Sequence, residues 1–365
     1  SRGLGDVYKR QNVFLLMVIV GLFGSNALGG LSGSLSLELD RWYWLFVVNI
    51  ISAILCLILG NVILRKNEYH QTSDIHISRS MMITLVLSTI SLMIPMSLLT
   101  QKGYHSLWVW PILLIAIFFI VNFIITNRQA THPIVHFHTL FSKKPFVGAK
   151  MAISSHLTLL TGIAGINVYI VRILKLPFDI SLHFYFFFFV GVIITGILKM
   201  FFYSSVGAVF LGTLGSSALL YVSIHWIILG NTINIPLLYI QGLLLGFGAS
   251  MSLVSGSMAT LLDGDLKEAA QRSQTMHTIR NFSAAMLIPI IAYTIKNHIQ
   301  KGTQSIYAEN ITDKMIYLKK LQDVAIDADH QIFLLMIIFN MVMFVSSIIQ
   351  MILGKGRRIT PPRES

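Results

Sequence analysis

The sequence predicts an all-α polytopic membrane protein with about ten transmembrane helices. Hydrophobic residues make up 55% of its 365 residues, charged residues make up only 12%, and the mean hydropathy is +0.73. A soluble domain carries about 25% charged residues. The apolar runs are continuous and close to the ~20 residues that a bilayer-crossing helix needs, which favours helices over a β-barrel.

Ten apolar runs define the predicted spans. In chain order they cover 12–34, 42–64, 80–100, 107–126, 146–172, 181–202, 206–229, 234–262, 276–297 and 331–354. Charged residues and prolines gather mainly at the ends of these runs. The longest polar connection, between Asn297 and His330, is expected to be an outer loop.

Basic residues predict how the chain is oriented. They gather in alternate connections, namely Arg65, Lys66 and Arg79, then Arg128, Lys143 and Lys144, then Lys199, then Lys267 and Arg272. Short cytoplasmic loops of membrane proteins are rich in Lys and Arg, so these connections and both chain ends are expected in the cytoplasm. The same rule accounts for the net charge of +12 without a nucleic acid partner. The single cysteine, Cys56, excludes a disulfide within the chain.

The first two runs carry a glycine motif followed by an aromatic motif. The first consists of Gly21, Ser25, Asn26, Gly29 and Gly30, and the second of Trp42, Trp44, Phe46 and Asn49. The first resembles the Gly-x3-Gly-Pro-x2-Gly-Gly end of the fifth span in major facilitator superfamily antiporters, with Ser25 and Asn26 replacing Gly and Pro. The second resembles the Trp-Arg-Trp-x-Phe-x-x-Asn segment that follows in fourteen-span drug:proton antiporters of that superfamily.

Three later stretches extend this resemblance. They are the loop from His132 to Phe146, the turn Leu176-Pro177-Phe178, and the opening of a span from His277 to Ala285. They are similar to the loop before the family's ninth span, the turn after that span, and the start of the thirteenth. If the first run is the fifth span, the resemblance implies a C-terminal fragment with a partial major facilitator fold that lacks the first four spans.

The resemblance also implies a division of the chain. In order, we expect a non-native or cytoplasmic leader (1–11), the last two helices of the N-terminal bundle (12–64), two extra central helices with cytoplasmic loops (65–145), a C-terminal six-helix bundle (146–354) and a basic cytoplasmic tail (355–365). The polar leader lacks the apolar core of a signal peptide.

His156 is the best candidate for a proton carrier. No Asp or Glu lies in the middle of a predicted span, whereas His156 lies near mid-depth of its run beside Ser154, Ser155 and Thr158. A neutral histidine loads and releases protons near physiological pH. The alternative is a histidine that only hydrogen-bonds to a neighbouring helix, because a polar group in a bilayer needs a partner.

Five further polar residues are candidates for a transport cavity or gate. Asn167, Tyr169, Arg172 and Tyr185 are candidates for the cavity wall, and Arg280 is a candidate for the inner gate through the family resemblance. Arg172 and Arg280 have an alternative role, in which each long side chain reaches water at the end of its helix.

Small residues recur along the predicted span 234–262. They are Gly242, Gly246, Gly248, Ser252 and Gly256, at intervals typical of close helix packing. We therefore expect these glycines, like Gly21, Gly29 and Gly30, to let helices approach rather than to bind a ligand.

The predicted function is secondary transport without a cofactor. The sequence has no Walker loop, and the spacing of His132, His136 and His138 matches no common zinc pattern, so the proton gradient is the expected energy source and no metal is expected. The resemblance implies export of drugs or other amphipathic small molecules across a bacterial cytoplasmic (inner) membrane by alternating access. The expected partners are the lipid bilayer, a small-molecule substrate, protons and a periplasmic adaptor protein. Transport of a specific metabolite, a lipid-modifying enzyme and a non-transporting membrane protein remain as alternatives.

Overall fold

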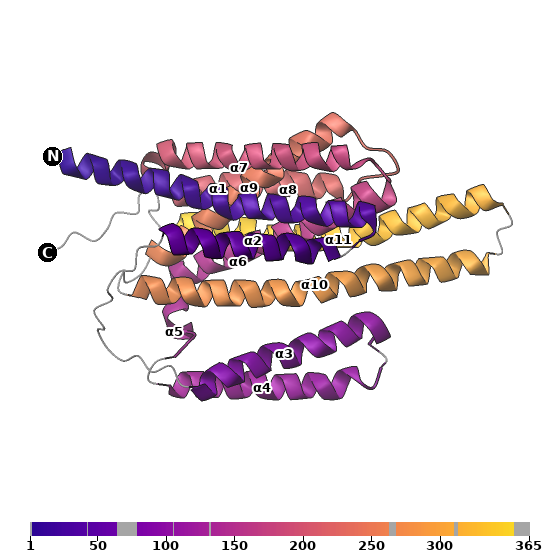
Figure 1. Ribbon diagram of the computed structural model, residues 1–365, viewed down its shortest axis with the longest axis horizontal. Helices are drawn as coiled ribbons and strands as arrows, with labels where there is room; N and C mark the ends of the chain where they lie inside the picture. The colour runs from indigo at the N-terminus through magenta and orange to yellow at the C-terminus, as the bar shows by residue number, and fades with distance from the viewer. Residues whose placement is uncertain are drawn as a thin grey trace.

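The computed structural model describes residues 2–41, 43–63, 79–104, 106–130, 133–262, 268–309 and 313–353, and within these ranges the fold is all-α (Figure 1). Its helices are α1 (Arg2–Leu39), α2 (Tyr43–Ile63), α3 (Arg79–Lys102), α4 (Val109–Gln129), α5 (Phe137–Leu140), α6 (Lys143–Asn167), the π-helix η1 (Val168–Ile173), α7 (Phe178–Val206), α8 (Ala208–Trp226), α9 (Ile235–Leu262), α10 (Ala269–Ala308) and α11 (Lys314–Leu353). The predicted fold class is confirmed.

Nine helices in the described ranges are long and apolar enough to cross a membrane, and they correspond to the last nine predicted spans. The first predicted span, 12–34, lies inside α1. Residues 2–11, which were expected as a leader, form the beginning of the same helix. The expected tail at 355–365 and the basic residues Arg65 and Lys66 lie outside the described residues.

Local sequence signals explain several helix ends. Gly207 has a φ of +89°, which favours glycine, and it lets the chain pass from α7 directly into α8. Asn234 and Asp313 accept backbone hydrogen bonds from Leu237 and Met315, respectively, and so satisfy free N–H groups in the first turns of α9 and α11.

The predicted outer loop from Asn297 to His330 is wrong, because most of it is helical. Helices α10 and α11 each contain 40 residues, which corresponds to about 60 Å at the 1.5 Å rise of an α-helix. The hydrocarbon core of a bilayer is about 30 Å thick. The two helices therefore extend beyond the rest of the bundle as a hairpin, visible on the right of Figure 1. The sequence of these extended ends is polar, so a prediction based on apolar runs did not include them in the helices.

Helix α9 lies at the centre of the bundle. It packs against α6, α7 and α8, while α11 packs against α6 and α8 and α1 packs against α7. The main apolar cluster includes Phe23 of α1, Trp226 of α8 and Phe333 of α11, none of which is exposed. Helices from both halves of the sequence therefore contribute to one core.

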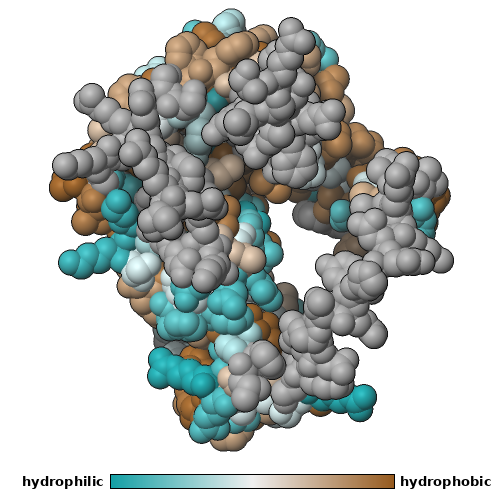
Figure 2. All heavy atoms as spheres, turned by 90° about the vertical axis from the view of Figure 1, so that its left-hand side faces the viewer, coloured by the Kyte–Doolittle hydropathy of each residue, from teal (hydrophilic) through white to brown (hydrophobic). Residues whose placement is uncertain are grey.

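The remaining helices lie at the periphery. No side chain described in α2 is buried. Helices α3 and α4 pair with each other and sit apart from the main bundle in Figure 1, where α3 contacts α10. Lys296 of α10 donates hydrogen bonds to the carbonyls of Thr100 and Gln101 at the end of α3, both at 3.0 Å. In the end view of Figure 2, the upper part of the coloured surface is mostly hydrophobic, and hydrophilic side chains gather across its middle and lower parts.

Candidate functional site

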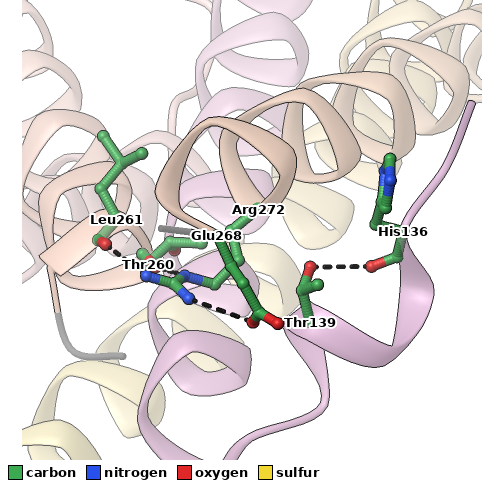
Figure 3. A network of polar contacts seen from close by, with 6 residues as sticks. All are labelled: His136, Thr139, Thr260, Leu261, Glu268 and Arg272. Atoms are coloured by element: carbon green, nitrogen blue, oxygen red, sulfur yellow. Dashed lines mark hydrogen bonds and ion pairs between the residues drawn. The ribbon is translucent and has the colours of Figure 1, made fainter. Parts of the chain in front are cut away.

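Arg272 ties α10 to the end of α9 (Figure 3). Its side chain is 1% exposed, and it donates to the carbonyls of Thr260 at 3.0 Å and Leu261 at 2.7 Å. A third nitrogen lies 3.7 Å from the carboxylate of Glu268. The last four carbonyls of a helix lack partners within it, and a cation at that end is favourable. Arg272 is thus a buried cap of α9 that lies in the first turn of α10, rather than in the loop where the sequence analysis placed it.

The segment around α5 docks beside this cap. The backbone N–H of His136 donates to Thr275 Oγ1 at 3.0 Å. Figure 3 shows a second hydrogen bond, in which Thr139 Oγ1 donates to the carbonyl of His136 at 2.8 Å. Within the described part of the chain, the buried Nδ1 atom of His136 has no hydrogen-bond partner. Burial and the nearby His138 lower the pKa of His136, while Glu268 opposes that shift. The neutral imidazole therefore suits this docked arrangement.

Lys199 is a second buried cation at the interface of α7 and α9. Its side chain is 1% exposed, and Nζ donates to the carbonyl of Met251 and to Ser255 Oγ, both at 3.0 Å. Lys199 was expected in a connection between spans, but it lies inside α7 and faces α9. Its two hydrogen bonds to a backbone carbonyl and a hydroxyl of α9 link the two helices.

His156 and Arg280 are brought together with His277. His156 lies about 20 Å along α6 and Arg280 about 16 Å along α10, at the 1.5 Å rise per residue of an α-helix. Arg280 and His277 are both close enough to His156 to interact with it electrostatically. We call His156, His277 and Arg280 the basic cluster. The structure buries Arg280 at 9% exposure, which does not fit a side chain that reaches water at a helix end.

Asn167 and Tyr185 meet at a second polar contact, between α1, α6 and α7. Asn167 Nδ2 donates to the carbonyl of Gly30 at 3.0 Å, and Tyr185 Oη donates to Asn167 Oδ1 at 2.8 Å. A Cβ atom on Gly30 would lie 2.4 Å from the Tyr185 ring. These predicted site residues satisfy one another and hold α1 against the bundle.

Tyr169 and Arg172 lie on η1, away from the basic cluster. Tyr169 is fully buried, and its hydroxyl donates to the carbonyl of Gly230 in the connection between α8 and α9. Arg172 forms an ion pair of 2.7 Å with Asp40, and both side chains are substantially exposed. Arg172 therefore fits the interpretation as an anchor at the helix end rather than the wall of an enclosed cavity.

Asp329 is a buried carboxylate that the sequence analysis missed. It was placed in the polar loop before the last span, but it lies inside α11 and is 1% exposed. Neither of its oxygens has a hydrogen-bond partner among the described residues, and Tyr169 is near enough to interact with it electrostatically. Asp329 lies three residues after Ile326, a buried residue of the same helix. This helical spacing is the sequence signal that could have placed Asp329 on the inner face of α11.

The predicted packing glycines fall into two groups. Those of α9 lie against other backbones, since a Cβ on Gly246 would lie 2.0 Å from the carbonyl oxygen of Phe188 and one on Gly256 2.7 Å from the nitrogen of Ala152. Gly242 and Gly248 are similarly close to α7 and α8. In contrast, Gly21 and Gly29 of α1 have no atom within 4 Å of such a Cβ.

Together these features define a polytopic α-helical membrane protein whose bundle holds polar and charged side chains in its interior. No protein-family model matches the chain, but two bacterial proteins are similar to it. It is 20% identical over 358 residues to an uncharacterized MFS-type transporter, YubD, of Bacillus subtilis (strain 168). The matched region covers 96% of this chain and 66% of that relative. It is 28% identical over 149 residues to the quinolone resistance protein NorB of Staphylococcus aureus (strain MRSA252). This matched region covers 40% of this chain and 30% of that relative.

These similarities agree with an all-α membrane protein of the major facilitator type and support a secondary transporter rather than an enzyme. The chain spans 66% of the length of the first relative and 30% of the length of the second.

Proposed function

We propose that this chain belongs to a proton-coupled secondary transporter that exports amphipathic small molecules by alternating access. The observation that carries the proposal is the similarity to an MFS-type transporter along 96% of the chain. Export of a drug-like substrate is supported by the shorter similarity to a quinolone resistance protein. In this proposal the bundle α6–α11 rocks against the opposite half of the transporter, with basic connections on the cytoplasmic side of a bacterial inner membrane.

Proton coupling requires a side chain that can gain and lose a proton inside the bundle. His156 in the basic cluster and the buried Asp329 are two candidates among the described residues, because both are titratable side chains within the helices of the bundle. The variants His156→Gln and Asp329→Asn keep the approximate size and the hydrogen-bonding capacity of the original side chains, but the new side chains cannot titrate. We expect at least one of these variants to abolish proton-driven transport without lowering the amount of protein in the membrane.

Dye accumulation in an efflux-deficient bacterium tests the proposal. Cells that express the gene should accumulate less ethidium than cells with an empty vector, and a protonophore should remove the difference. Export that continues after the proton gradient has collapsed would contradict proton coupling. Equal accumulation with and without the protein, at verified membrane expression and across amphipathic cations and zwitterions, would contradict drug export.

A further inference from the structure

Three cations are buried inside the described part of the bundle, and two of them are well satisfied. Lys199 donates to two oxygens of α9, and Arg272 donates to two carbonyls and lies near Glu268. The third, Arg280, lies two turns beyond Arg272 on the same helix. The comparison isolates Arg280 as the buried cation whose surroundings require an explanation.

Arg280 lacks the acceptors that a buried guanidinium needs. Among the described residues, its buried Nε atom has no partner, and its one hydrogen bond runs from Nη2 to Asn281 Oδ1 at 3.5 Å, the long limit for such a bond. No carboxylate of the described residues forms an ion pair with it. Arginine carries five N–H donors, and an uncompensated buried charge is costly.

The nearest ionisable neighbours of Arg280 are also basic. His277 lies on the same helix one turn earlier, and His156 faces it from α6. Both histidines are partly exposed, so the basic cluster is open at its edge rather than sealed in the core. Two helices thus present a fixed positive charge and two imidazole rings to one place, with no negative group there among the described residues.

We propose that the basic cluster binds the carboxylate of an amphipathic solute, with Arg280 as the principal contact and His156 and His277 beside it. The planar guanidinium matches a carboxylate with two parallel hydrogen bonds, and it would supply the charge compensation that Arg280 lacks. A single fixed cation suits a monoanionic group. This inference rests on the proposed transport function, since it names the chemical class of solute for the same bundle.

A matched pair of dyes tests the site. Rhodamine B carries a free carboxylate, whereas rhodamine B ethyl ester has the same cationic ring system and no carboxylate. We would measure the binding of both to the purified 365-residue chain in lipid nanodiscs by fluorescence polarisation. The unmodified protein should bind rhodamine B about tenfold more tightly than the ester, the ratio that corresponds to about 1.4 kcal/mol.

The variants separate recognition from folding. Arg280→Gln should abolish the preference for the carboxylate, and Arg280→Lys should keep only part of it because the two parallel hydrogen bonds are lost. Arg172→Gln is the control, because it removes an exposed arginine that already has a carboxylate partner in Asp40, and it should leave the ratio unchanged. If Arg280→Gln weakens the binding of both dyes equally, Arg280 has a structural role and the proposal is overturned.

The unmodified protein decides the matter even if Arg280→Gln does not fold. If it binds both dyes equally, or neither, the carboxylate site is refuted, including the case in which a carboxylate of the protein itself pairs with Arg280. If it discriminates between the dyes but moves neither across liposome membranes, the transport proposal fails and the carboxylate site stands. If it moves both dyes without preference, only the carboxylate site fails.

Discussion

Helices α2 and α9 are both apolar enough to span a membrane, but their surroundings differ. Helix α2 is the more apolar of the two, and none of its apolar stretch is buried inside the protein, whereas 67% of that of α9 is buried. Helix α9 carries glycines and hydroxyl residues where its neighbours approach, while α2 consists mainly of large aliphatic side chains. In a bilayer, the buried helix is therefore marked by small residues and polar contacts rather than by greater hydrophobicity.

The strongest test of this comparison is to add volume to a glycine of α9. Gly246→Leu places side-chain atoms where the backbone of Phe188 already lies, so α7 and α9 must separate. We expect a loss of about 3 kcal/mol or more, because overpacking against backbone is not relieved by rotamer changes. The loss of stability is measured by thermal unfolding, with size-exclusion chromatography as the readout of the folded fraction. Gly29→Leu, at a glycine with open space around it, should cost far less; equal losses would break the comparison.

Removing the cap of α9 should have the next largest effect. Arg272→Gln leaves the carbonyls of Thr260 and Leu261 without their buried donor, and we expect a destabilisation of about 1–3 kcal/mol. The same thermal assay measures it, with Arg128→Gln, at the end of the peripheral helix α4, as the control. A melting temperature equal to that of the unmodified protein would show that water replaces the arginine at no cost.

The polar contact that holds α1 should contribute less. Asn167→Leu removes the hydrogen bonds to Gly30 and Tyr185, and we expect a loss of about 1 kcal/mol, as for other hydrogen bonds between membrane helices. Tyr185→Phe tests the same contact from the other side. Because the two residues share one hydrogen bond, the double variant should lose less than the sum of the single losses. Additive losses would show that the contact is not coupled.

The smallest effect is expected in α2. Ile54→Ala removes aliphatic volume from a side chain that is 50% exposed, so it should change the stability by less than about 0.5 kcal/mol. Leu245→Ala removes a similar volume from a fully buried position of α9 and should cost about 2–5 kcal/mol. Similar losses for the two variants would indicate that α2 is packed against protein after all.

Hydropathy predicted the fold class well because each apolar run must satisfy its backbone within one helix. It failed for residues 297–330, where α10 and α11 continue as helices through polar sequence. Orientation rules treat Lys and Arg as loop residues, so Lys199 and Arg272 were missed. Their partners are carbonyls and a hydroxyl of α9, and those positions depend on how neighbouring helices are aligned.

The candidate site was predicted only as separate residues. His156 was recognised because a titratable side chain inside an apolar run is unusual, whereas Arg280 was a candidate through the family resemblance. Their proximity, and the participation of His277, require the relative rotation of α6 and α10, which no pattern within either segment specifies. Asp329 was missed for a related reason, since its burial depends on helix α11 beginning far before its apolar run.

The hairpin formed by the extended ends of α10 and α11 acts geometrically as a lever. Gly302 lies against Val324 across the hairpin, where a Cβ would be 2.5 Å from that side chain, and Glu309 and Lys320 form an ion pair near its tip. The two arms should therefore tilt together. At 1.5 Å per residue the arms extend about 16 Å in α10, from Asn297 to Ala308, and about 24 Å in α11, from Lys314 to His330, so a tilt of about 10° displaces the tip by about 3–4 Å. A spectroscopic label on the exposed Glu309 would convert a small rotation of the bundle into a distance change that is large enough to measure.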